Sequence, residues 1–134
     1  MTVNSEILSD DFWVRELVVL LEKSGFHSIK ADYPHTPYGA PKRIYDSAPM
    51  ITATDKRDRF CIVEITDQIQ FETLAFKQRW QDFAKYANHH HTQILLFVPK
   101  GLDEKAAKTC KKFGIAEQFS RIKGFLEPQV QPTA

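Results

Sequence analysis

Two short apolar segments separated by an amphipathic one constrain the fold more than any other feature of the chain. Residues 60–66 (FCIVEIT) are rich in β-branched and aromatic types, and residues 92–99 (TQILLFVP) form a continuous apolar run, so both segments are predicted to be strands. Between them, residues 71–88 carry apolar side chains at helical spacing. A strand–helix–strand unit normally joins parallel strands through a right-handed crossover. The sequence therefore predicts an α/β fold.

The rest of the chain adds a helix, two strands and a further helix to this unit. The expected helices cover residues 10–24 and 103–113, and the expected strands cover residues 26–33 and 50–54. Residues 55–58 (DKRD) are predicted to turn an antiparallel hairpin between the second and third strands. The order is thus αβββαβα, which indicates a mixed sheet covered by helices on both faces in a three-layer α/β/α core. Residues 115–126 fit an edge strand or a short helix.

Length and composition indicate one ordinary globular domain. The 134 residues suffice for a single core, which we assign to residues 1–126, followed by a flexible C-terminal tail at residues 127–134. A net charge of +1 excludes a strong overall field toward nucleic acid or membrane, but it permits a local basic patch. No apolar run is long enough to cross a bilayer, and the polar N-terminus lacks the pattern of a signal peptide. Cys61 and Cys110 form no Cys-x-x-Cys pair and are expected to be free thiols, so we expect a cytoplasmic protein with no membrane partner.

Glu64 is the unusual residue of the third strand. Strand alternation places Glu64 on the same face as Ile62 and Thr66, and Cys61 on the other. An ionised carboxylate inside a covered strand is costly unless it is paired or binds a metal ion. The strand alone favours a place for Glu64 at its solvated end, where Asp67 follows.

Two motifs, in this element order, resemble a known nuclease superfamily. WVRELVVLLEKSGF (residues 13–26) resembles the first helix of archaeal-type Holliday junction resolvases, with its Arg-Glu-Leu start, double leucine and closing Gly-Phe. Residues 48–66 (APM…FCIVEIT) then fall where that family has a Pro-Asp step, a hairpin and a Glu-x-Lys strand. The chain therefore resembles the PD-(D/E)xK, or restriction-endonuclease-like, superfamily over roughly residues 10–115.

The resemblance implies a Mg²⁺-dependent site whose residues have mostly changed. In the family, an aspartate, a glutamate and a lysine converge on the metal ion, and resolvase-like members add a first-helix glutamate. Here Glu64 occupies the glutamate position, Thr66 the lysine position, Met50 the aspartate position and Val14 the first-helix position. A thioether is a poor ligand for Mg²⁺, and a hydroxyl cannot supply a cation. We therefore expect a degenerate site with Glu64 as a remnant, held by a hydrogen bond or by water, and with no cofactor.

A rebuilt site is the alternative. Asp46 or Asp55 could replace the missing aspartate, with Asp46 the better candidate, and Lys77 or Arg79 could replace the lysine. Mg²⁺ would be a cofactor only in that case. The competing interpretation is that both aspartates are ordinary turn residues.

Cations in two loops are candidates for DNA contacts. Phosphate binding requires such groups, and the resemblance places both loops at the rim of a DNA cleft. The cations are Lys42, Arg43, Lys56, Arg57 and Arg59, and the tyrosines that could stack on bases are Tyr33, Tyr38 and Tyr45. Aspartates at positions 46, 55 and 58 dilute the patch, so a solvated loop of mixed charge is an equal interpretation.

Two further groups have simpler interpretations. The run His89–His91 could bind a transition metal, but it more often ends a helix. Trp80, Phe83 and Tyr86 are expected to be core or dimer contacts, and related nucleases make a homodimer plausible. The sequence leaves open whether the protein binds a small-molecule ligand.

Three functions follow from these observations. The first is a catalytically degenerate nuclease fold that binds DNA or assists DNA processing. The second is an active endonuclease with a site rebuilt on Asp46 and Glu64. The third is a homodimeric protein-interaction domain without a nucleic-acid role.

Overall fold

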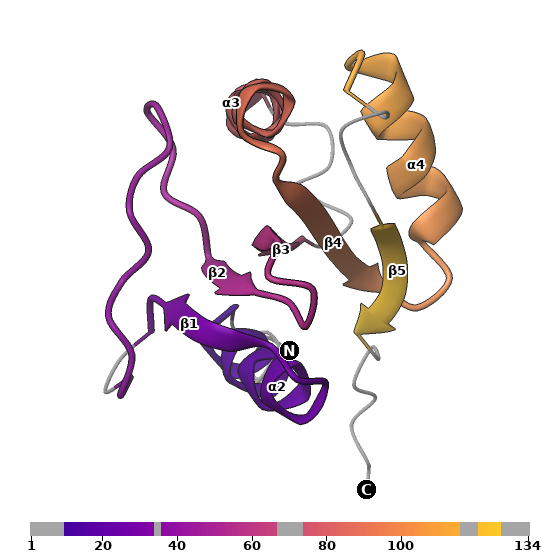
Figure 1. Cartoon of the computed structure of the whole chain (residues 1–134). Helices are drawn as coiled ribbons and strands as arrows, with labels where there is room; N and C mark the ends of the chain where they lie inside the picture. The colour runs from indigo at the N-terminus through magenta and orange to yellow at the C-terminus, as the bar shows by residue number, and fades with distance from the viewer. Residues whose placement is uncertain (1–9, 34–35, 67–73, 116–120, 127–134) are drawn as a thin grey trace, which may run out of the picture.

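A mixed sheet of five strands, in the order β1-β2-β3-β4-β5, forms the middle layer of the molecule (Figure 1). The computed structural model describes residues 10–33, 36–66, 74–115 and 121–126. The elements are α2 (Asp10–Lys23), β1 (His27–Ala31), β2 (Ile51–Thr54), β3 (Phe60–Ile65), α3 (Leu74–His90), β4 (Gln93–Pro99), α4 (Asp103–Lys112) and β5 (Arg121–Leu126).

The hairpin and the crossover have the predicted strand directions. β1, β2 and β3 pair in antiparallel fashion, whereas β3 pairs with β4 and β4 with β5 in parallel. Cys61 lies opposite Gln93 and Ile65 opposite Phe97, so the crossover through α3 returns the chain beside the strand it left. The open choice for the last element is settled: residues 121–126 form the edge strand β5.

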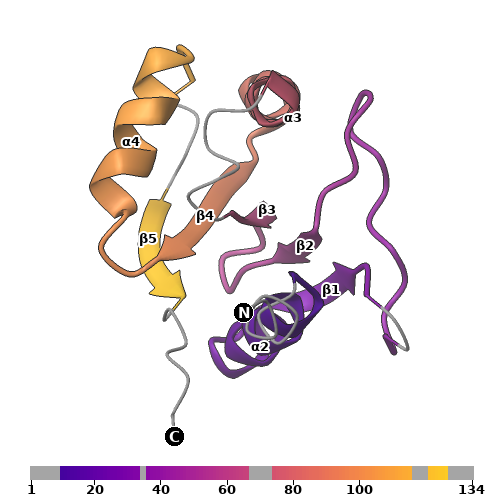
Figure 2. The same ribbon diagram turned by 180° about the vertical axis from the view of Figure 1, so that it is seen from behind.

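Helices cover both faces of the sheet, and each face has its own core. Figures 1 and 2 show α2 on one side and α3 with α4 on the other. Alternation along β3 assigns Cys61, Val63 and Ile65 to the core under α2, and Ile62 to the core under α3 and α4. The expected three-layer α/β/α arrangement is confirmed.

Gly25 ends α2, as its sequence predicts. Its φ is 91°, a left-handed value that glycine adopts without steric cost. The Gly25 N–H donates to the Glu22 carbonyl at 3.1 Å, and the Phe26 N–H donates to the Leu21 carbonyl at 3.0 Å. These two bonds form a Schellman cap, which turns the chain directly into β1.

The long connection between β1 and β2 passes to the side of the sheet that carries α3 (Figure 1). Ile44 of this loop is buried in the core under α3 and α4. The Ser47 hydroxyl donates to the Asp82 carboxylate of α3 at 2.8 Å. The loop is therefore anchored on α3 before the chain enters β2.

Some predictions fall outside the described residues. These are the tail at 127–134, the N-terminal residues 1–9, the helix start at 71–73, and Asp67. Within the described residues, no helix has the length and apolar character needed to span a membrane.

Candidate functional site

Glu64 forms a two-point ion pair with Arg79 of α3. Arg79 Nε donates to Glu64 Oε1 at 2.6 Å, and Arg79 Nη2 donates to Glu64 Oε2 at 2.9 Å. Glu64 is 0% exposed, so its predicted place at a solvated strand end is wrong. The arginine makes burial possible, because a paired charge offsets much of the desolvation that an isolated carboxylate would suffer.

The Arg79 guanidinium is itself held in place. It lies over the Phe83 ring, with 5.1 Å between its central carbon and the ring centroid. Such a contact attracts a cation to the ring face. The side chain of Arg79 is 22% exposed, so the pair lies at the edge of the core and not at its centre.

Met50 lies against Glu64. The Met50 N–H donates to Glu64 Oε2 at 2.9 Å, and the Ile65 N–H lies 3.4 Å from the Met50 sulfur. The backbone at the expected aspartate position therefore reaches the glutamate. Its side chain offers a soft thioether where a Mg²⁺ site would need oxygen.

The residues at the other two motif positions, Thr66 and Val14, are buried in the protein. Thr66 is buried, and its N–H donates to the Phe97 carbonyl of β4 at 3.1 Å. Val14 packs in the core under α2, on the opposite face of the sheet from Glu64. Of the two proposed replacements for the lysine, Lys77 is exposed, with its ammonium over the Phe113 ring, whereas Arg79 reaches Glu64.

The two candidate aspartates occupy different turns. Asp46 is exposed, and its carbonyl accepts a hydrogen bond from the Arg43 guanidinium. Asp55 is buried at the hairpin and accepts the N–H groups of Arg57 and Arg59, each at 2.9 Å, and Arg59 Nε at 2.8 Å. Burial raises the pKa of Asp55, but the hydrogen bonds from Arg59 and Arg57 and the charge of Arg59 outweigh it and hold the pKa below its ordinary value. Asp55 therefore shapes the hairpin.

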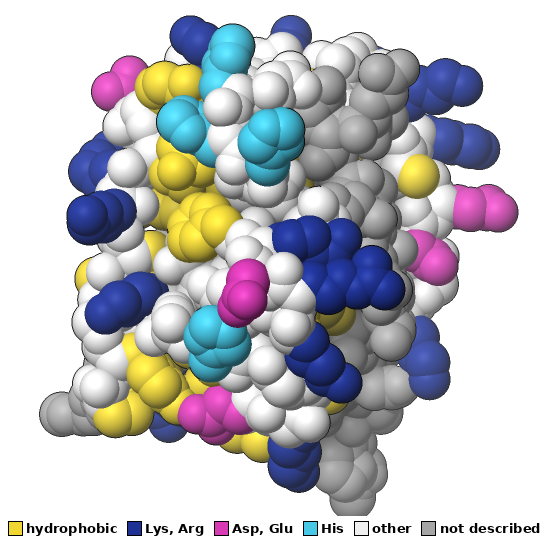
Figure 3. Space-filling view, in the orientation of Figure 1, with side chains coloured by type: hydrophobic (Ala, Val, Ile, Leu, Met, Phe, Trp, Pro, Cys, Tyr) yellow, Lys and Arg dark blue, Asp and Glu magenta, His cyan; other side chains and the backbone are white. Residues whose placement is uncertain are grey.

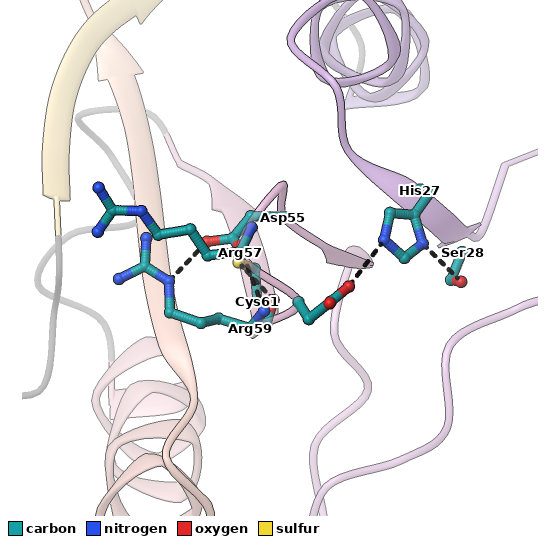
Figure 4. Close-up of polar contacts among 7 residues, drawn as sticks. His27, Ser28, Asp55, Arg57, Arg59 and Cys61 are labelled. Atoms are coloured by element: carbon teal, nitrogen blue, oxygen red, sulfur yellow. Dashed lines mark hydrogen bonds and ion pairs between the residues drawn. The ribbon is translucent and has the colours of Figure 1, made fainter.

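The hairpin carries three of the predicted DNA-binding cations. Lys56, Arg57 and Arg59 are all exposed, and Figure 4 shows the side chains of Arg57 and Arg59 extending in the same direction. Arg59 forms an ion pair with Asp55. At the other side of the turn, His27 of β1 lies 3.5 Å from the Asp58 carboxylate. The hairpin thus presents Arg57 and Arg59 on one side and the contact between Asp58 and His27 on the other.

A hollow of about 610 Å³ opens beside these cations. Leu20 and Phe26 line it from the end of α2, and Leu95 and Phe97 line it from β4. Arg57 and Arg59 line it from the hairpin. Two arginines and several apolar side chains therefore line the same hollow.

Lys42 and Arg43 are exposed in the loop before β2, and Tyr45 follows Arg43 by two residues. Tyr33 and Tyr38 instead pack partly buried against the core under α2. The Tyr38 hydroxyl donates to the Glu22 carboxylate, and this bond raises the pKa of Tyr38. Tyr45 is therefore the tyrosine of this set that remains available for stacking.

The ring of Tyr86 contacts an aromatic residue next to each of the two basic segments, residues 42–43 and 56–59. The sequence did not indicate these contacts. Its ring centroid lies 6.5 Å from that of Tyr45 and 6.4 Å from that of Phe60, both in edge-to-face contact. Tyr45 follows Arg43 by two residues and Phe60 follows Arg59 directly. Trp80 and Phe83, grouped with Tyr86 in the sequence interpretation, are core residues as expected.

The three histidines lie at the end of α3 and are exposed. Among the residues that the structure describes, no group of three His, Cys, Asp or Glu side chains is placed to hold a metal ion. Cys61 and Cys110 are free and buried, as predicted. Burial raises the pKa of Cys61 to about 11 and that of Cys110 to about 12.

Comparisons with known proteins give one likeness. No family model matches the chain, and a search of curated proteins finds no match. Among solved structures, "Structure of EndoMS-dsDNA2 complex" matches with a TM-score of 0.46 and 12% identity, over 87% of this chain and 44% of that chain. This chain thus spans less than half the length of that protein. At such a TM-score the likeness assigns neither a family nor an activity to the chain.

Proposed function

We propose that this protein is a non-catalytic nuclease-like domain that binds DNA through the cations of its β2–β3 hairpin and of the loop before β2. The observation that carries the non-catalytic part is the buried ion pair between Glu64 and Arg79. A carboxylate that accepts two guanidinium N–H groups and one backbone N–H has little capacity left for a metal ion. A metal ion would also have to enter beside a fixed positive charge.

The cations support the DNA part. Lys56 and Arg57 are exposed at the hairpin, and Lys42 and Arg43 are exposed in the loop that ring contacts connect to it. Cations that contact phosphates release counterions from DNA, so binding weakens as salt rises. Each phosphate contact contributes a slope of about −0.9 in a plot of log affinity against log salt for duplex DNA.

The test measures binding of labelled duplex and single-stranded DNA by fluorescence anisotropy over a range of salt, in EDTA and in Mg²⁺. We expect salt-sensitive binding in EDTA, which shows that no metal ion is required, and no cleavage in Mg²⁺. The double variant Lys56→Gln/Arg57→Gln should reduce the salt slope by about 2. The matched control, Lys105→Gln/Lys108→Gln on the exposed face of α4, removes the same charge and should leave the slope unchanged.

The same assay separates the alternatives, which stay predictions. Cleavage in Mg²⁺ that disappears in Glu64→Ala would establish the nuclease rebuilt on Asp46 and Glu64. Absence of binding to any DNA at low salt would reject the proposal and leave the homodimeric protein-interaction domain. An equal loss of slope in the α4 control would show that net charge alone attracts the DNA.

A further inference from the structure

Four exposed or partly exposed rings from three parts of the chain meet on one surface. We call Tyr45, Phe60, Tyr86 and His90 the ring cluster. Tyr86 and His90 are stacked, with centroids 4.1 Å apart and planes 20° apart, and Tyr45 and Phe60 meet Tyr86 edge to face. Tyr45 is 47% exposed and Phe60 is 37% exposed, so the cluster presents ring surface to solvent.

Tyr45 has an unusual backbone conformation. Its φ is 55°, in the left-handed region that a bulky residue seldom adopts. The turn around it is closed by two backbone hydrogen bonds between Ile44 and Ser47, of 2.8 and 3.0 Å, and Ser47 is bound to Asp82. The ring is thus held outward by a strained turn fixed at both ends, and strain of this kind is found where function requires it.

A lysine lies directly against the ring cluster. Lys85 Nζ lies 4.9 Å from the centroid of the Tyr45 ring, whereas Arg57 and Arg59 line the hollow between α2 and β4. Figure 3 shows hydrophobic and histidine side chains on the same face as a group of lysines and arginines. The surface therefore combines flat apolar rings with cations, a composition that complements the bases and phosphates of a nucleic acid strand.

We propose that the ring cluster binds unpaired DNA bases by stacking, while the adjacent cations contact the phosphates of the same strand. This inference rests on the proposed DNA binding and specifies the form of DNA that is preferred. Bases in a duplex are already stacked on one another, so exposed rings gain contact only with unpaired bases. Loss of one stacked base should reduce affinity for a single strand roughly 5- to 150-fold.

The decisive variant is Tyr45→Asn. Asparagine removes the ring but tolerates a left-handed φ, so the fold should keep or gain thermal stability. We expect at least a fivefold loss of affinity for a labelled single strand, with less than a twofold change for the duplex. Tyr45→Phe keeps the ring and should bind as the parent does, and Phe12→Ala removes a ring of similar exposure on α2 and should also bind normally.

Three results would overturn the inference. Single-strand affinity of Tyr45→Asn within twofold of the parent would show that the ring makes no contact. An equal loss for single strand and duplex would indicate an effect on charge or on the fold. A parent protein that binds duplex and single strand equally well would leave the proposed function standing and reject the preference, whereas a parent that binds neither would reject both.

Discussion

The ion pair between Glu64 and Arg79 makes a strong prediction about stability. Arg79→Met removes the guanidinium and keeps a side chain of similar reach, which leaves the carboxylate of Glu64 buried with the Met50 N–H still donating to it. Removing one partner of a buried ion pair typically costs about 3–5 kcal/mol, because the remaining charge has lost its counter-charge. Arg79 is 22% exposed, so water can partly replace it, and we expect about 3 kcal/mol.

Glu64→Gln should cost less. The amide keeps an acceptor for the Met50 N–H, and the guanidinium left behind can turn toward solvent, so we expect about 1–2 kcal/mol. In the double variant neither charge remains, and its destabilisation should be at least about 1 kcal/mol smaller than the sum of the single effects. That difference is the coupling free energy of the pair.

Urea unfolding followed by tryptophan fluorescence and far-UV circular dichroism measures these values. With a slope of about 2 kcal/mol per molar, Arg79→Met should lower the midpoint by roughly 1–2 M urea. Lys108→Met, on the exposed face of α4, is the control and should stay within about 0.5 kcal/mol of the parent. Single effects that simply add, with a coupling below about 0.5 kcal/mol, would refute the interpretation of the pair as a buried, mutually dependent unit.

Two further predictions concern titratable groups. The pKa of folded Asp55 lies below its ordinary value of 3.8, so the Asp55 carboxylate stabilises the fold above that pH and this stabilisation is lost as pH falls below it. Asp55→Asn should therefore lower the free energy of unfolding by about 2 kcal/mol at pH 7 and by less at pH 3, as measured by urea unfolding. An equal loss at both pH values would contradict this. Cys61 and Cys110, with pKa values of about 11 and about 12, should resist iodoacetamide at pH 8 in the native protein and react fully in urea, as mass spectrometry would show. Rapid modification of native Cys61 would mean that the hairpin opens readily.

The fold was predictable because its signals are local. Apolar runs, helical spacing and the glycine after α2 each act within a few residues, and together they predicted every element of the order αβββαβα. Residues 121–126 remained open because a short segment with mixed spacing fits a strand and a helix equally. This segment forms a strand because it pairs with β4, which is distant from it in the sequence.

The candidate site was less predictable because its contacts join distant segments. Arg79 was one of two cations offered as a replacement for the missing lysine, and only the packing of α3 against β3 selects it over Lys77. The ring cluster was missed for the same reason. Tyr86 has the spacing of a core residue, and nothing local shows that the turn at Tyr45 and the start of β3 converge on it.

Glu64 lies far from the hairpin cations, so its structural role is separate from their proposed role in DNA binding. Its carboxylate joins three elements, since it lies on β3, accepts the N–H of Met50 just before β2 and binds Arg79 of α3. The cations of the hairpin lie at the other end of the same strand, roughly 13 Å away over the four residues from Phe60 to Glu64. A residue that fixes the packing of three elements affects binding at that distance only if the fold changes. Glu64→Gln should therefore lower stability and leave DNA affinity unchanged under conditions where the variant is folded, and a loss of affinity in the folded variant would refute this separation.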